Sequence, residues 1–282
     1  YAVFGVNEFA ARFWSAVLGV GTACLTYAIG RRLFSPVLGL WAAVILVTTL
    51  MFDVAARAAT PDSLLVFWST AALCIYVYGT FSSSSDRSAG PAMDRLFPRW
   101  HVAAWMYAMM GMAVLAKGPV GLVLPTAVIG MYLLLQRLPV RGTMPAALWG
   151  RIWTCWMMRP ITAVLVASAV ALPWYIAVGL RTDGEWIKGF LLEHNLGRAA
   201  APMEGHGGSF FFYPAALLVG FFPWSVFAAP TLMESIHRIR RRAGQVDGLI
   251  LAVCWVGVYV GLFSMARTKL PSYVTPCYPA VA

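Results

Sequence analysis

The sequence predicts an all-α, multi-pass membrane bundle whose functional residues gather at the outer ends of its helices. Hydrophobic residues fill 60% of the 282 positions and charged residues only 11%, whereas soluble domains usually carry about 25% charge. The mean hydropathy of the chain is +0.73. So little polar surface excludes a water-soluble domain, and the recurrence of long apolar runs favours a polytopic transmembrane helical bundle.

Six apolar runs are each long enough to cross about 30 Å of hydrocarbon, namely 12–30, 37–55, 62–80, 161–179, 212–232 and 248–265. A longer tract, 101–136, is interrupted by Lys117, Gly118 and Pro119. Because a lysine followed by Gly-Pro stops one helix and starts another, we expect two spans in this tract. The prediction is therefore eight complete spans and the start of a ninth at Pro271. Since the chain begins at Tyr1 and stops inside an apolar stretch, we expect 1–282 to be truncated at both ends.

Basic residues divide unevenly between the two sets of alternate loops, with thirteen in one set and eight in the other. By the positive-inside rule, the richer set faces the cytoplasm. The formal net charge of +10 then meets anionic lipid headgroups rather than nucleic acid. The five cysteines are scattered without metal-type pairs, so neither a disulfide nor a cysteine metal site is expected.

Thr60, Pro61 and Asp62 open one of the predicted spans on the outer side. In a purely structural interpretation Thr60 is the N-cap, Pro61 the first helical residue, and Asp62 is stabilised by the helix dipole. In a functional interpretation Asp62 is a carboxylate held at the membrane surface, able to act as a base or to accept a hydrogen bond from a sugar hydroxyl. Arg57, one turn earlier, either pairs with Asp62 or Asp53, or binds an anion.

Two lysines occupy similar positions at the outer ends of predicted spans. Lys117 precedes Gly-Pro, and Lys269 precedes Leu270 and Pro271, with Tyr273 alongside. A cation at a helix C-terminus is favourable in itself. A lysine beside the following helix N-terminus is also suited to bind an anion. Capping alone does not require two such lysines on the outer side, so both interpretations stay open.

The longest outer loop runs from about 180 to 211 and carries two histidines. A helical wheel of 186–196 places Trp186 and Phe190 on an apolar face with His194 at its middle, which predicts a helix lying in the outer interface. His206 lies in a glycine-rich stretch, 205–208, whose backbone can approach a ligand closely. Together with two glutamates of the loop these histidines could supply one or two metal ligands, although their spacing matches no complete metal motif.

Seven short landmarks resemble, in order and across all 282 residues, the membrane part of bacterial lipid-linked-sugar glycosyltransferases, which are related to protein mannosyltransferases and lipid A aminoarabinose transferase. These landmarks are Phe4 to Arg12, Gly30 to Phe34, Thr60 to Asp62, Lys117 to Pro119, Glu193 to Asn195, Gly205 to Gly207 and Lys269 to Tyr273. The resemblance implies a GT-C type fold with a cavity at the outer, periplasmic face of the inner membrane. It also implies transfer of a sugar from a polyprenyl-phosphate carrier to a lipid, glycan or protein acceptor.

The resemblance also suggests roles for individual residues. Asp62 matches an acidic position of the family and is the expected catalytic carboxylate within 1–282. The expected substrate-binding residues, which would hold the phosphate or the sugar, are Arg57, Lys117, His206, Lys269 and Tyr273. His194 matches a histidine that holds a divalent metal ion in aminoarabinose transferases. The family's principal catalytic acid lies in the first outer loop, which would precede Tyr1.

Two other classes of protein stay open on the residues alone. A transporter or flippase of a lipid-linked or small substrate would use the same outer cavity, and a membrane scaffold would have no pocket there. No predicted span carries an ionisable residue near its middle, which disfavours an ion-coupled transporter. A covalent product would separate the transferase from both alternatives, whereas the sequence leaves the sugar and the acceptor open.

Overall fold

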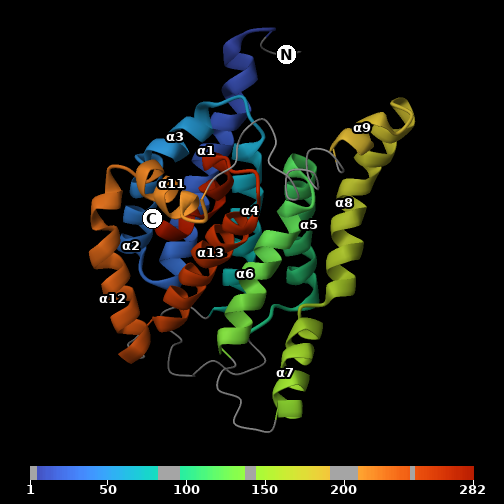
Figure 1. Ribbon diagram of the computed structural model, residues 1–282. Helices are drawn as coiled ribbons and strands as arrows, with labels where there is room; N and C mark the ends of the chain where they lie inside the picture. The colour runs from blue at the N-terminus through green and yellow to red at the C-terminus, as the bar shows by residue number, and fades with distance from the viewer. Residues whose placement is uncertain (1–4, 82–95, 137–143, 191–208, 242–244) are drawn as a thin grey trace.

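The computed structural model describes residues 5–81, 96–136, 144–190, 209–241 and 245–282 of the chain. Every regular element in these ranges is a helix, which confirms the predicted all-α class for the described residues. Most long helices run side by side in one bundle, with α8 (Pro160–Arg181) at one edge and α12 (Ala228–Arg241) at the opposite edge (Figure 1).

Among the described residues, four stretches of helix are long and apolar enough to cross a membrane singly. They are α1 (Glu8–Leu33), α4 (Asp62–Thr80), α8 joined to the end of α7 (Met144–Met157), and α13 (Val246–Met265). These helices cover the apolar runs at 12–30, 62–80, 161–179 and 248–265. The number rises to six if each of two bent helix pairs counts as one span, so the eight complete spans expected from the sequence stay a prediction.

The tract 101–136 forms two helices, as predicted. α5 (Trp100–Lys117) ends and α6 (Val120–Gln136) begins on either side of Gly118 and Pro119. The two helices pack closely because Gly121 has no side chain: a Cβ there would lie 2.3 Å from the carbonyl carbon of Ala113. The core of the bundle includes many apolar side chains from α4, α5, α6 and α13, and others from the helices around them.

The runs 37–55 and 212–232 each form a bent pair of helices rather than one straight helix. The first is bent by 68° between α2 (Pro36–Val47) and α3 (Leu50–Arg57). There the hydroxyls of Thr48 and Thr49 donate to carbonyls one turn back, at 2.7 Å each, an arrangement that bends helices. The second is bent by 116° after α11 (Phe212–Gly220), next to Pro223, which lacks the N–H needed to continue a helix.

The two breaks lie against each other and satisfy each other's polar groups. The Leu50 N–H donates to the Phe222 carbonyl at 3.0 Å. The indole Nε1 of Trp224, in the short helix η4 (Trp224–Phe227), donates to the Thr48 hydroxyl at 2.8 Å. Because a bilayer offers no water to unpaired backbone groups, an interrupted membrane helix needs such protein partners.

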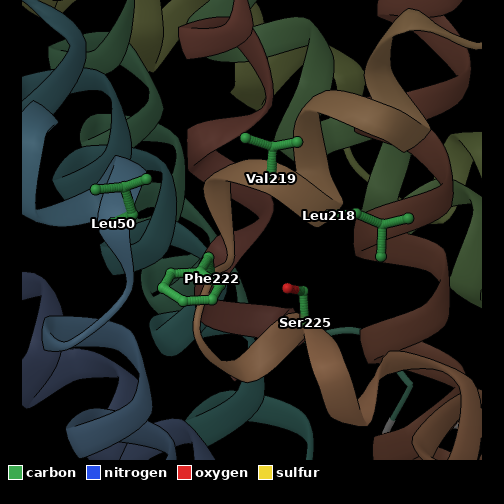
Figure 2. A pocket seen from close by; sticks show the side chains of 5 residues that line it. All are labelled: Leu50, Leu218, Val219, Phe222 and Ser225. Carbon is green, nitrogen blue, oxygen red and sulfur yellow. The ribbon is translucent and has the colours of Figure 1, made fainter.

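A groove of about 410 Å³ opens beside the paired breaks, lined by Leu50, Leu218, Val219, Phe222 and Ser225 (Figure 2). Four of the five side chains are apolar and about half or more exposed. None of the predicted site residues that the structure describes lines this groove, and its lining differs from the charged site described below.

The chain ends in η5 (Pro271–Cys277) and α14 (Tyr278–Val281). Helical structure therefore begins at Pro271, where the sequence predicts the start of a ninth span. Its first residues form a 3₁₀-helix rather than an α-helix.

Candidate active site

An ion pair joins Asp62 and Lys117, whose side chains come from neighbouring helices. Asp62 is the first residue of α4, and Lys117 is the last residue of α5. Each charge is favoured by its helix dipole, the carboxylate at an N-terminus and the ammonium at a C-terminus. Only 14% of the Asp62 side chain and 23% of the Lys117 side chain are exposed. The pair is therefore partly shielded from water but accessible.

The start of α4 differs slightly from the sequence interpretation. Pro61, in the right-handed helical region, precedes the helix, and α4 begins at Asp62. The N-cap is therefore Pro61 rather than Thr60, and the first helical residue is Asp62 rather than Pro61. The carboxylate consequently stands at the first position of the helix and reaches across to α5.

Gly118 allows α5 to end with Lys117 at this place. Its backbone has φ +82° and ψ −160°, a region that is essentially restricted to glycine. Its N–H donates to the Val114 carbonyl at 2.7 Å. The chain can therefore turn directly into α6 after the lysine.

Tyr273 completes a three-residue contact with the ion pair. The Lys117 ammonium lies 4.9 Å from the centre of the Tyr273 ring, within the range of a cation–π interaction. Tyr273 is buried, and its N–H donates to the Leu270 carbonyl at 3.1 Å. Its ring also packs against that of Phe263 at 5.1 Å. The predicted residues Asp62, Lys117 and Tyr273 therefore meet at one point.

Lys269 lies nearby but uses its ammonium differently. Only 5% of the residue is exposed. The ammonium donates to the carbonyls of Ser264 and Ala266, at 2.9 and 3.1 Å, which belong to the end of α13. It also lies 5.3 Å from the ring centre of Tyr213. The capping interpretation accounts for these contacts, and phosphate binding by Lys269 stays a prediction.

Arg57 pairs with Asp53 rather than with Asp62, at 2.8 Å on the exposed surface of α3. This settles the pairing that the sequence left open. With 76% of its side chain exposed, Arg57 is accessible to an anion in solution or at the membrane surface.

His194 and His206 lie outside the described residues, as do Glu193 and Glu204, the two glutamates considered with them as metal ligands. Among the residues that the structure describes, no three histidine, cysteine, aspartate or glutamate side chains gather into a metal-binding group. The metal and the histidine roles therefore remain predictions. The expected interfacial helix is described only at its start, where the rings of Trp186 and Phe190 stack at 4.7 Å as the helical wheel predicts.

Two residues of the site were missed in the sequence. Tyr213 is fully buried, and its hydroxyl accepts a hydrogen bond from the Leu270 N–H at 3.2 Å. Phe263 packs between Tyr213 and Tyr273, at 5.9 and 5.1 Å. A tyrosine in the first turn of an apolar run was an available signal for Tyr213, whereas Phe263 looks like any other apolar residue of its span.

The model of the dolichyl-phosphate-mannose-protein mannosyltransferase family matches residues 1–186 of this chain. The chain is 28% identical over 281 residues to the undecaprenyl phosphate-alpha-4-amino-4-deoxy-L-arabinose arabinosyl transferase of Edwardsiella ictaluri, covering 99% of this chain and 46% of that protein. Identity to the protein of the same name from Pseudomonas paraeruginosa is 30% over 279 residues, covering 98% and 45%.

A solved structure has a similar fold. ArnT from Cupriavidus metallidurans, crystallised with undecaprenyl phosphate, matches with a TM-score of 0.77 at 25% identity, over 100% of this chain and 46% of that one. Its apo form matches with a TM-score of 0.74. The chain thus spans slightly less than half the length of the proteins it resembles.

Proposed function

The chain belongs to the dolichyl-phosphate-mannose-protein mannosyltransferase family, and from this premise we propose that the protein transfers a sugar from a polyprenyl-phosphate carrier to an acceptor. Its fold is of the GT-C type, as predicted. The related transferases are named for an undecaprenyl-phosphate-linked donor, and an undecaprenyl-phosphate-linked sugar is the donor we propose here. The acceptor is a lipid, a glycan or a protein.

The observation that carries the proposal is the contact of Lys117, Asp62 and Tyr273 where helix ends meet. A reaction that releases a lipid phosphate needs a cation to stabilise the developing negative charge. It also needs a carboxylate near the sugar or the acceptor. The ion pair holds both groups in place before any substrate arrives.

We propose that the donor phosphate takes the place of the Asp62 carboxylate beside the Lys117 ammonium. Asp62 is then free to accept a hydrogen bond from a hydroxyl of the sugar or the acceptor. Tyr273 keeps its ring under the ammonium and offers its hydroxyl to the phosphate or the sugar. Arg57, exposed on α3, is a second cation that could guide the phosphate toward the membrane surface.

In the transfer itself, the acceptor nucleophile forms a bond to the anomeric carbon of the sugar. The bond from that carbon to the phosphate oxygen breaks, and its electron pair stays on the phosphate beside Lys117. The proton of the acceptor passes to a carboxylate at the outer face. A divalent ion, if His194 contributes to holding one, would supply further positive charge near the phosphate.

The positive-inside distribution supports placing this site on the periplasmic side of the inner membrane. A polyprenyl carrier stays in the bilayer, and Asp62 and Lys117 lie at the ends of membrane-length helices, where a lipid headgroup would be. The donor, the acceptor and the surrounding bilayer are therefore the proposed partners.

The test is a transfer assay in proteoliposomes with an undecaprenyl-phosphate-linked sugar as donor and the full-length protein that contains this chain. We expect a covalent sugar–acceptor product, and a loss of at least tenfold in kcat/KM for Lys117→Ala, because one charge-assisted contact to phosphate is worth about 1.5–3 kcal/mol. Arg238→Ala is the matched control, since Arg238 also belongs to an ion pair, with Glu234 on α12 at 2.7 Å.

Two outcomes would overturn the proposal. One is normal turnover by Lys117→Ala. The other is movement of the lipid-linked substrate across sealed vesicles without any covalent product, which would identify a flippase. If the proposal is correct, Lys117→Ala raises the KM for the donor, whereas Arg238→Ala has the kinetics of the wild-type protein.

A further inference from the structure

A tyrosine ties α5 to α8 at each end of their contact. At one end the Tyr175 hydroxyl, from α8, donates to the Val114 carbonyl of α5 at 3.0 Å. At the other end the Tyr107 hydroxyl, from α5, donates to the Met158 carbonyl just before α8. Small residues fill the space between: a Cβ on Gly111 would lie 2.9 Å from the Val170 Cβ. The two helices are thus closely packed and fixed at both ends.

The Tyr175 bond falls on the turn that ends with Lys117. The Val114 carbonyl already accepts the N–H of Gly118 at 2.7 Å, and a carbonyl oxygen has two lone pairs. Tyr175 supplies the second donor. Its hydroxyl therefore holds the last turn of α5, from Val114 to Gly118, in the position from which Lys117 reaches Asp62.

The other side of the Tyr175 ring faces the segment that follows α8. The ring lies 5.9 Å from that of Trp186, in α9 (Glu185–Ile187), and 6.0 Å from that of Phe190. Trp186 and Phe190 stack on each other, and the Trp186 ring also meets the edge of Trp174 at 4.8 Å. Only 9% of Tyr175 is exposed, so its hydroxyl is held in one place by packing.

We infer that Tyr175 is a positioning residue for Lys117, and that it transmits the placement of the outer segment after α8 to the ion pair. This inference rests on the proposed function for its link to donor binding. Tyr175 itself touches neither Lys117 nor Asp62 in any described contact. It acts by fixing the backbone that carries the lysine.

The experiment compares Tyr175→Phe with Tyr107→Phe in the full-length protein. Each variant keeps the ring and removes one hydrogen bond between the same two helices, so the two should lose similar amounts of thermal stability. For Tyr175→Phe we expect the KM for an undecaprenyl-phosphate-linked sugar to rise about fivefold, on the order of one lost hydrogen bond, with the acceptor KM unchanged. For Tyr107→Phe we expect both KM values to stay at the wild-type level.

A second readout does not depend on turnover. The Lys117 ammonium is labelled with acetic anhydride, and the extent is measured by mass spectrometry. Asp62→Asn, which removes the ionic partner, gives the labelling of a released ammonium. We expect Tyr175→Phe to raise Lys117 labelling toward that level and Tyr107→Phe to leave it unchanged.

Equal changes in the two tyrosine variants would show a general loosening of the helix pair and overturn the inference, as would wild-type labelling and donor KM in Tyr175→Phe. Failure of the wild-type protein to use the donor would instead overturn the proposed function. The labelling comparison would then still decide whether Tyr175 positions Lys117.

Discussion

Lys117 and Asp62 are 55 positions apart in the chain, yet their side chains form an ion pair. The topology explains the meeting. α4 starts at Asp62 and α5 returns beside it to end at Lys117, so the start of one helix and the end of the next lie on the same side. The pair therefore fixes the relative height of α4 and α5 in addition to holding two charges for chemistry.

Breaking this pair should cost stability as well as activity. Asp62→Asn or Lys117→Ala leaves one charge without its partner in a site that is mostly shielded from water. We expect each single variant to lose about 1–3 kcal/mol of unfolding free energy, less than for a fully buried pair because both groups keep some access to water. Denaturation of the purified protein in detergent measures the loss.

The double variant distinguishes pairing from separate effects. With both charges removed, the loss should be clearly smaller than the sum of the two single losses, because no unpaired charge remains. Additive losses would mean that the two side chains stabilise the fold independently. The exposed pair of Glu234 and Arg238 serves as the comparison, and its coupling should be smaller because water screens both charges.

The sequence was sufficient for the elements that depend on composition and local stop signals. Apolar runs located α1, α4, α8 and α13, and Lys117-Gly118-Pro119 located the break between α5 and α6. The bends after α2 and α11 were missed because apolar composition continues through both of them. Those bends depend on partners distant in sequence, such as the bond from Trp224 to Thr48, which no local pattern reveals.

The site was predictable in its residues but not in its pairings. Asp62, Lys117 and Tyr273 each stood out as polar residues at the end of an apolar run. The sequence suggested Arg57 as a partner of Asp62 or Asp53 and did not pair Asp62 with Lys117, since a local pattern gives no distances between helices. Lys269 resembled Lys117 in its local sequence, but the carbonyls at the end of α13 take up its ammonium.

Gly118 should be intolerant of any side chain. Its φ of +82° with ψ of −160° is strained for every L-residue, so Gly118→Ala should cost about 1–3 kcal/mol. It should also move Lys117 relative to Asp62 and raise the donor KM. Gly257→Ala is the control, because that helical glycine has open space around it. Equal stability of the two variants would show that the turn does not need the glycine conformation.

The contact between α1 and α2 should depend on Gly30 and Gly39, which lie against each other. A Cβ on Gly39 would lie 2.5 Å from the Tyr27 carbonyl oxygen and 2.6 Å from the Arg31 nitrogen, and backbone atoms cannot give way as a side chain can. We expect Gly39→Ala to push the helices apart and lose about 1–3 kcal/mol. Gly261→Ala, a glycine without such neighbours, should be neutral or slightly stabilising in the same melting experiment.

The bond between the two helix breaks should also be measurable. Trp224→Phe keeps an aromatic ring but removes the indole donor, and Thr48→Val removes the acceptor. Each should cost about 0.5–1.5 kcal/mol, and a double-variant cycle should give a coupling near 0.6 kcal/mol, since hydrogen bonds between membrane helices are modest. Trp153→Phe, at an exposed tryptophan of α7, controls for the loss of an indole.

A coupling near zero would mean that the breaks are held together by the Leu50 bond to Phe222 and by packing alone. In that case Leu50→Pro, which deletes the backbone donor, should destabilise the protein far more than either side-chain change.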